Sequence, residues 1–487
     1  MRTALSVVLL SLCASAQSAS PYPNDLFRQA HDFFARVPAP DDRAYGLAEL
    51  LMHAPNMPAN ELSSWAGEAY QASLTLKPSS RKSFIQQLSI QTIAHTDADA
   101  ALALLLQQGP LSPDSLAIFN PGISLGDPAR VVFRAMLARH GGDAIPQLTQ
   151  AVETVASKGA YPYLALSALM AQAAPEQKAK LFQAALAAYT QSNPTIGNDF
   201  QFAMFLKSVA FQVPKQVARP AAMQIVERME QFAAAGVPCD STLRLYSDNG
   251  MTVLNCSDRI MYEALPALER LNPEAAAKLK TSHPVLQQAT SSPDRLTMPM
   301  KNAPATPEAE KSQMLFDTSI MLEKIATQEP VKAAEIAGEL PDEFERLNTT
   351  VLVARELAAA DPERAKVMLN GILNQVGAID NSSSNKRITL SSNIASVAAK
   401  LGDRALLQES IQRAFAAARE NIANNKKAST ERRILLASNC YGLRLVPSFA
   451  ATAAPQLLLE VIPTLGDDEA EAYLLMYFAE ATLHADH

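Results

Sequence analysis

The segment Ile325–Ala333 (IATQEPVKA) recurs as Leu357–Ala365 (LAAADPERA), 32 residues further along the chain (357 − 325). In each copy an apolar residue and an alanine come first, an acidic residue and a proline follow, and another alanine lies three residues after the proline. The acidic side chain can accept hydrogen bonds from the free N–H groups that begin a helix, and proline fits the first turn of that helix. The pattern therefore predicts two helices joined by a tight turn, with small residues where they meet.

The same turn is found in other parts of the chain. Val397–Ala405 (VAAKLGDRA) is a third copy at a spacing of 40 residues (405 − 365). Ile93–Ala101 (IAHTDADAA) aligns with Leu357–Ala365 without a gap at an offset of 264 (357 − 93), and Met170–Ala179 is a looser copy. A helix–turn–helix unit repeated every 30–40 residues is the signature of stacked helical repeats. The copy at Ile93 extends this prediction to the N-terminal half.

These turns resemble those of the tetratricopeptide and HEAT classes of helical-repeat proteins. The resemblance covers short segments at about four places, and the aromatic and glycine positions of the tetratricopeptide motif are missing. It implies an all-α fold, an α-solenoid of antiparallel helix pairs that stack on one another. It also implies an extended concave surface that binds segments of other proteins.

The composition favours helices and excludes one class of partner. Hydrophobic residues make up 48% of the 487 residues, charged residues 19%, and glycine only 17 residues. Alanine, leucine, glutamine and glutamate favour helices, and β-branched runs are scarce. The net charge is −7 and no basic run is present, whereas proteins that neutralise many phosphates carry a basic face. We therefore expect no nucleic-acid partner.

Residues 1–16 have the pattern of a secretory signal peptide. One positive charge precedes the apolar run Ala4–Leu12, and Ala14–Ala16 supplies the small residues of a cleavage site. We therefore expect export to the periplasm or the extracellular space. A leucine precedes Cys13 where a lipoprotein signal requires a small residue, so the sequence does not favour lipidation. No later apolar run approaches the ~20 residues that span a bilayer, so no transmembrane span is expected in the mature chain.

A proline-rich segment divides the mature sequence. Residues 281–312 contain five prolines among Ser, Thr and Ala, which indicates a linker. We therefore predict an N-terminal helical-repeat domain at 21–280 and a C-terminal helical-repeat domain at 313–487.

One short stretch departs from the helical pattern. Between Cys239 and Cys256, apolar residues alternate on either side of Asp248–Gly250, which predicts a small hairpin or structured loop. In an exported protein the two cysteines are predicted to tie this loop through a disulfide. The remaining mature cysteine, Cys440, is interpreted as a buried small residue rather than a reactive thiol.

Short matches to catalytic motifs lack the context that their chemistry requires. Gly122–Gly126 (GISLG) matches the nucleophile elbow, but Asp127-Pro128 then begins a helix and no strands surround the motif, so we interpret it as an interhelical loop. Ser79–Lys82, Ser247–Asn249 and Lys280–Ser282 resemble the three motifs of serine penicillin-binding enzymes and β-lactamases. The first two lie 168 residues apart (247 − 79), too far for one compact helical domain.

The histidines and cysteines also show no metal-site pattern. None of the seven histidines forms H-E-x-x-H, and no cysteine–histidine pair has zinc spacing. We therefore predict no catalytic residue, no cofactor and no metal site.

Three functions remain open from the sequence. The first is an exported, non-enzymatic helical-repeat scaffold that binds another protein or a peptide segment. The second is an exported all-helical hydrolase acting on polysaccharide or peptide, which would need two carboxylates facing one cleft. One tryptophan and 6% aromatic residues argue against sugar stacking. The third is a structural component of the cell envelope.

Overall fold

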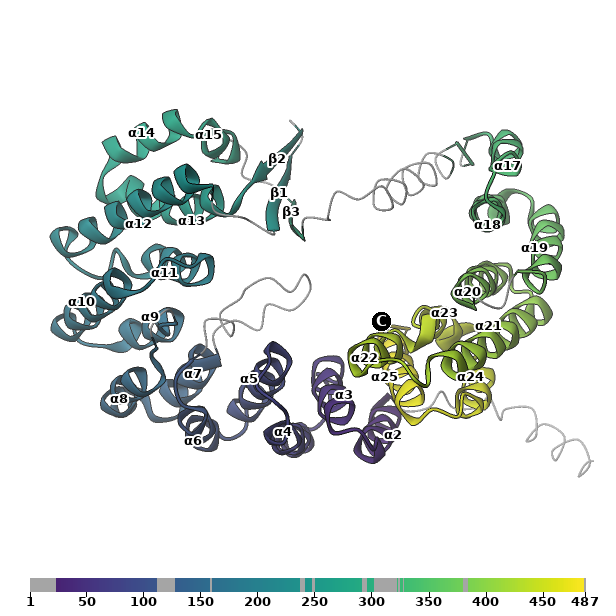
Figure 1. The fold of residues 1–487 in the computed structure, drawn as a ribbon, viewed down its shortest axis with the longest axis horizontal. Helices are drawn as coiled ribbons and strands as arrows, with labels where there is room; N and C mark the ends of the chain where they lie inside the picture. Colours follow the sequence, from purple (N-terminus) through teal and green to yellow (C-terminus); the bar gives the residue numbers. More distant parts are fainter. Residues whose placement is uncertain are drawn as a thin grey trace, which may run out of the picture. The chain divides into compact units, whose positions relative to one another are not determined.

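A computed structural model describes residues 23–111, 128–157, 160–236, 241–247, 250–290, 296–301, 322, 325–326, 328–379 and 384–485. The chain is predominantly helical, as its composition and turn pattern predict (Figure 1). It divides into two compact units, one made of Met1–Pro58 with Ala305–His487 and the other of Ala59–Pro304. The predicted signal peptide, residues 1–16, lies outside the described residues.

The unit Ala59–Pro304 is built from short helices that follow one another closely. They are α4 (Ala59–Leu74), α5 (Ser80–Ala94), α6 (Ala98–Gln108), α7 (Pro128–His140), α8 (Ile145–Val155), α9 (Tyr163–Gln172), α10 (Pro175–Gln191), α11 (Ile196–Val209), α12 (Lys215–Ala235), α13 (Cys256–Leu271), α14 (Pro273–Ser282) and α15 (Pro284–Thr290). A 3-10 turn, η2 (Gly141–Ala144), connects α7 to α8.

The odd-numbered helices of this unit form a row. α5 packs on α7, α7 on α9, α9 on α11 and α11 on α13, as Figure 1 shows. Even-numbered helices cover the row, since α6 contacts α7, α10 contacts α9 and α12 contacts both α11 and α13. Large aromatic side chains fill the space between the layers, and the Tyr189 and Phe202 rings stack with centroids 3.8 Å apart. This unit is thus a two-layered helical array with an aromatic core.

The same unit carries a small antiparallel sheet. Strands β1 (Ser241–Ser247) and β2 (Gly250–Leu254) form the predicted hairpin, with Leu243 opposite Leu254. The third strand, β3 (Leu296–Lys301), pairs with the other edge of β1 and places Pro299 opposite Leu243. Proline is tolerated there because β3 is an edge strand.

Part of the predicted linker is therefore folded. Residues 281–282 end α14, and α15 and β3 also lie within 281–312. Proline density misled the prediction because Pro284 occupies the first position of a helix, where its missing N–H is not needed. Cys256 is disulfide-bonded. Cys239 lies outside the described residues, so the Cys239–Cys256 pairing stays a prediction.

The second unit combines helices from both ends of the chain. They are α2 (Pro23–Arg36), α3 (Pro40–His53), α17 (Pro330–Gly338), α18 (Glu343–Ala360), α19 (Pro362–Val376), α20 (Ser384–Leu401), α21 (Arg404–Asn425), α22 (Thr430–Ser438), α23 (Val446–Ala453), α24 (Pro455–Val461) and α25 (Asp468–Ala485), with 3-10 turns η4 (Cys440–Gly442) and η5 (Ile462–Thr464). From α17 to α21, each helix contacts the next along the chain.

The repeated turns form as predicted at three of the four closest copies. Asp361 accepts a hydrogen bond from the Arg364 N–H at 3.1 Å and begins α19. Asp403 and Asp97 cap α21 and α6 in the same way, each at 3.1 Å. At the first copy, Pro330 begins α17, but Glu329 makes no side-chain cap. The aspartate side chain, which is one methylene shorter than that of glutamate, accepts a hydrogen bond from an N–H in the first turn of the helix. Aspartate is accordingly among the residues preferred at the N-cap.

The N-terminal helices pack against the C-terminal helix. α2 and α3 both contact α25, and α22 contacts α3 and α25 (Figure 1). The ring of Phe34 meets Tyr473 edge-on at 4.9 Å and lies so close to α3 that a Cβ on Gly46 would be 2.3 Å from it. The compact units thus differ from the predicted domains 21–280 and 313–487, because residues 23–58 belong with the C-terminal part.

Among the described residues, no helix has the length and the apolar character needed to cross a membrane.

Candidate functional site

The contact of α2 and α3 with α22 and α25, here called the terminal junction, contains a cluster of buried charges. Asp42 in the first turn of α3 is 2% exposed, and its carboxylate lies 2.9 Å from the Arg433 guanidinium of α22. The two residues are separated by 391 positions in the sequence. A buried carboxylate requires such a partner, because burial without one strongly disfavours the charged form.

Glu469 adds a second carboxylate to the terminal junction. It lies in the first turn of α25, and its Oε1 atom is buried without a hydrogen bond to any described residue. Burial first, and then the negative charges of Asp42 and Asp467, raise the pKa of Glu469 to about 8, against an opposing effect of Arg433. Glu469 therefore carries a proton at neutral pH while Asp42 is paired with Arg433.

His53 is a further titratable group of the junction. Its Nδ1 lies 3.0 Å from a Glu480 oxygen of α25, and its Nε2 lies 3.7 Å from a Glu49 oxygen one helical turn earlier. Burial opposes the charged imidazole, but the hydrogen bonds to Glu480 and Glu49 outweigh it and raise the pKa of His53 to about 9. The same hydrogen bond lowers the pKa of Glu480.

Replacing His53 by glutamine should therefore remove a pH-dependent part of the stability. A folded pKa above the unfolded value of 6.5 gives stability that is fully present below pH 6.5 and is lost as pH rises through about 9. We expect His53→Gln to lower the free energy of unfolding by at most about 3 kcal/mol at pH 6 and by little at pH 10. Urea denaturation of both proteins across this range measures the difference. The exposed His95→Gln is the control, and equal losses at pH 6 and pH 10 would contradict the assignment.

The backbone beside the junction is strained at two residues. Cys440 and Tyr441 in η4 have φ values of 47° and 49°, which side chains with a Cβ rarely adopt. Cys440 is fully buried, as predicted, and burial raises the pKa of its thiol. The Tyr477 hydroxyl of α25 donates to the Ser438 carbonyl at 3.0 Å and holds the end of α22, just before this turn, against α25. The junction is thus stabilised by contacts on several sides.

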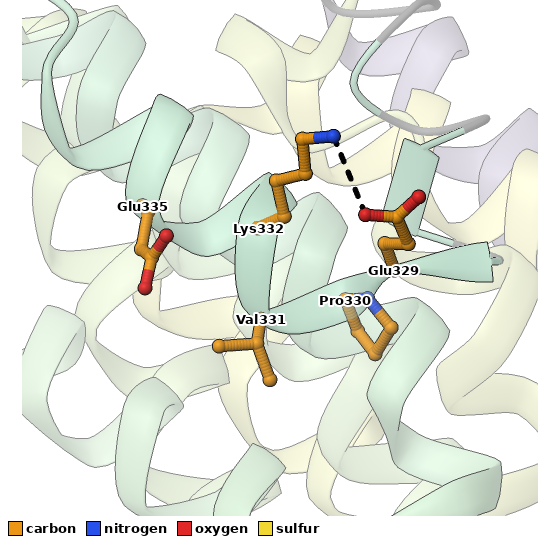
Figure 2. A pocket seen from close by; sticks show the side chains of 5 residues that line it. All are labelled: Glu329, Pro330, Val331, Lys332 and Glu335. Atoms are coloured by element: carbon orange, nitrogen blue, oxygen red, sulfur yellow. Dashed lines mark ion pairs between the residues drawn. The ribbon is translucent and has the colours of Figure 1, made fainter.

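A shallow depression flanks α17 in the same unit. Its volume is about 540 Å³, and it is lined by Glu329, Pro330, Val331, Lys332 and Glu335. Figure 2 shows the Lys332 side chain reaching toward the Glu329 carboxylate, at 3.4 Å, while Val331 and Glu335 lie apart from this pair. Both charges are mostly exposed and compensate one another. This depression lacks a set of side chains converging on a ligand.

A second depression, here called the α7–α9 groove, lies on the odd-numbered row of the other unit. Its volume is about 350 Å³. Three helices contribute its walls, which comprise Arg130, Arg134, Leu137, Ala138, Ser167, Ala168, Ala171, Gln172 and Ser208. Two arginines, three alanines and three hydrogen-bonding side chains thus line one hollow.

The helices that form this groove carry an excess of positive charge. α7 contains three arginines and a histidine but no acidic residue, and α9 contains no charged residue. At the end of α7, Arg139 lies 3.6 Å from Asp97 and 3.3 Å from Asp99, and His140 lies 3.1 Å from Asp99. Arg134 forms no ion pair or hydrogen bond with another described residue. The groove is therefore a basic site in a chain whose net charge is −7.

The residues of the short catalytic motifs have structural roles where they are described. Ser79 caps α5 by accepting from the Lys82 N–H, and the Lys82 ammonium donates to the carbonyls of Leu74 and Leu76 at the end of α4. The Lys280 ammonium pairs with Glu269. Gly122–Gly126 lies outside the described residues, as do two residues of the Ser247–Asn249 motif.

Neither the terminal junction nor the α7–α9 groove was predicted from the sequence. The junction joins residues that are hundreds of positions apart, so no local motif marks it. The groove had one available signal, since α7 has four basic and no acidic residues. Within the described ranges, no group of three or more His, Cys, Asp or Glu is arranged to hold a metal ion.

Comparison with known proteins adds little to this description. No family model and no curated protein matches the sequence. A solved structure described as "Circular tandem repeat protein with novel repeat topology and enhanced subunit contact surfaces" aligns with 94% of this chain and 94% of its own, at 12% identity and a TM-score of 0.17. Overlap at that level does not establish a common fold, so the helical arrays described above rest on the contacts within each unit.

Proposed function

We propose that this chain is an exported helical-repeat protein of the α-solenoid kind that binds a protein or peptide segment and does not itself catalyse a reaction. The observation that supports the proposal most directly is the row α5–α7–α9–α11–α13, in which each helix packs on the next. Rows of this type present a continuous surface to a partner, and the repeats share one buried core. The α7–α9 groove lies on that surface.

The hydrolase alternative would require two carboxylates that face a ligand-sized cleft. Asp42 and Glu469 are two carboxylates that interact within the terminal junction, and the pKa of Glu469 is raised. Both are covered by the packing of α3, α22 and α25, and neither lines the two depressions described above. Their burial instead supports a role in holding α2 and α3 on α25.

Affinity capture of the mature protein, residues 17–487, from its native host tests the proposal. We expect one protein partner to be recovered reproducibly and to resist a wash with high salt, as mass spectrometry would show. The scaffold assignment would be contradicted if the protein were recovered without a partner and also hydrolysed a member of a glycan and peptide panel. That result would favour a hydrolase. Recovery of only further copies of the same chain would favour the structural role in the envelope.

A further inference from the structure

We propose that the α7–α9 groove binds an acidic peptide segment, with Arg134 holding a carboxylate of that segment. This inference rests on the proposed binding function and names the chemistry of the partner. Arg134 is exposed on α7 and lies across the groove from α9, which has no charge of its own. A guanidinium binds a carboxylate through two parallel hydrogen bonds, so its geometry suits this ligand.

The other cations near the groove are already paired. Arg139 pairs with Asp97 and Asp99, and Lys207 of α11 lies 2.8 Å from Glu263 of α13. The positive charge available to a ligand is therefore concentrated at Arg134. A negatively charged ligand gains from this field, and a positively charged one is repelled.

The serines of the groove indicate a peptide rather than a small anion. The Ser167 hydroxyl donates its hydrogen to the Leu164 carbonyl at 2.7 Å, and the Ser208 hydroxyl donates to the Met204 carbonyl at 2.9 Å. With their hydrogens engaged, both oxygens remain available only as acceptors. A peptide backbone offers N–H groups to such acceptors, whereas sulfate carries no hydrogen to donate.

The remaining walls fit the backbone of such a segment. Gln172 is exposed, and its amide makes no hydrogen bond within the described part of the chain, so it can both donate to and accept from a peptide group. Ala138, Ala168 and Ala171 leave space for a chain to approach the helices closely. The volume of about 350 Å³ lies at the lower end of the range of ligand pockets, which suits a few residues of a longer segment.

A random dodecapeptide array probed with the mature protein tests this inference. We expect the bound peptides to be enriched in Asp and Glu, and Arg134→Glu to weaken binding of the tightest acidic peptide at least tenfold, about 1.4 kcal/mol. The variant should also shift the bound set toward Lys and Arg. Arg219→Glu is the matched control because it makes the same charge change at an exposed site on α12. Circular dichroism confirms that both variants fold.

Three outcomes would overturn the assignment. The bound peptides could show no acidic enrichment, the Arg134→Glu protein could bind the same set with the same affinity, or 10 mM inorganic phosphate could displace every peptide, which would indicate a small-anion site. A captured protein partner whose binding is unchanged in Arg134→Glu would refute this groove while leaving the scaffold function in place. If no protein partner is captured but the array still binds acidic peptides in a way that depends on Arg134, the groove assignment would stand and the scaffold function would be refuted.

Discussion

Replacing Arg228 by methionine should lower the free energy of unfolding by about 3–5 kcal/mol at pH 7, because it leaves a buried carboxylate without its partner. Asp199 on α11 has no exposed side-chain surface, and the Arg228 guanidinium of α12 lies 3.1 Å from it. Burial, against the opposing effects of its hydrogen bonds and of Arg228, raises the pKa of Asp199 to about 6. Methionine keeps much of the apolar stem but removes the charge together with the hydrogen bonds that the guanidinium donates to the carbonyls of Tyr189 and Ser192.

The pH dependence of this loss separates charge from packing. A raised carboxyl pKa means that the contribution of Asp199 to stability is fully present below about pH 3.8 and is lost as pH rises through about 6. Urea denaturation should therefore show a smaller loss for Arg228→Met at pH 5 than at pH 7. Adding Asp199→Asn should recover part of the stability at pH 7. Arg219→Met on the same helix is the control, and a loss that is equal at both pH values and unrelieved by Asp199→Asn would contradict the charge argument.

In contrast to Arg228→Met, Glu469→Gln should raise the free energy of unfolding, and it should do so at alkaline pH. The pKa of Glu469 is raised from 4.5 to about 8, so the wild-type protein loses stability as pH rises through this interval and the carboxylate ionises inside the terminal junction. Glutamine cannot ionise. At one pKa unit per about 1.4 kcal/mol, the variant should exceed the wild type by at most about 5 kcal/mol at pH 9 and match it near pH 5.

Thermal denaturation followed at 222 nm between pH 5 and pH 9 measures this difference. The exposed Glu460→Gln variant makes the same substitution on α24 and should follow the wild-type profile. Parallel curves for Glu469→Gln and the wild type over the whole range would show that Glu469 ionises without hindrance. Comparing differences at each pH removes the contribution of His53, which both proteins share.

Sequence reasoning succeeded where the deciding interactions are local. Asp97, Asp361 and Asp403 each bond to a backbone N–H three residues further on, so a short pattern contains both partners. The β1–β2 hairpin was accessible for the same reason, since its strands are separated by two residues. Strand β3 was missed because its partner β1 lies about 50 residues earlier and its own proline argues against a strand unless the edge position is known.

The two candidate sites depend on contacts that a linear pattern does not contain. Asp42 reaches Arg433 across 391 residues, and neither side chain differs in type from an ordinary surface charge. Arg134 becomes part of a groove only when α9 and α11 pack beside α7. Charge composition of α7 was visible in the sequence, but the direction in which that charge points was not.

The terminal junction has a consequence for the order in which the chain can fold during synthesis. The apolar face of α2, including Phe27 and Phe34, is buried in the finished unit, yet α25 begins at Asp468, 432 residues after α2 ends (468 − 36). At about 5–20 residues per second, a ribosome needs roughly 20–90 s to make the intervening chain. The apolar face of α2 therefore cannot be buried against α25 until the whole chain has been made. A chain that stops before α25 leaves this face exposed and prone to aggregation.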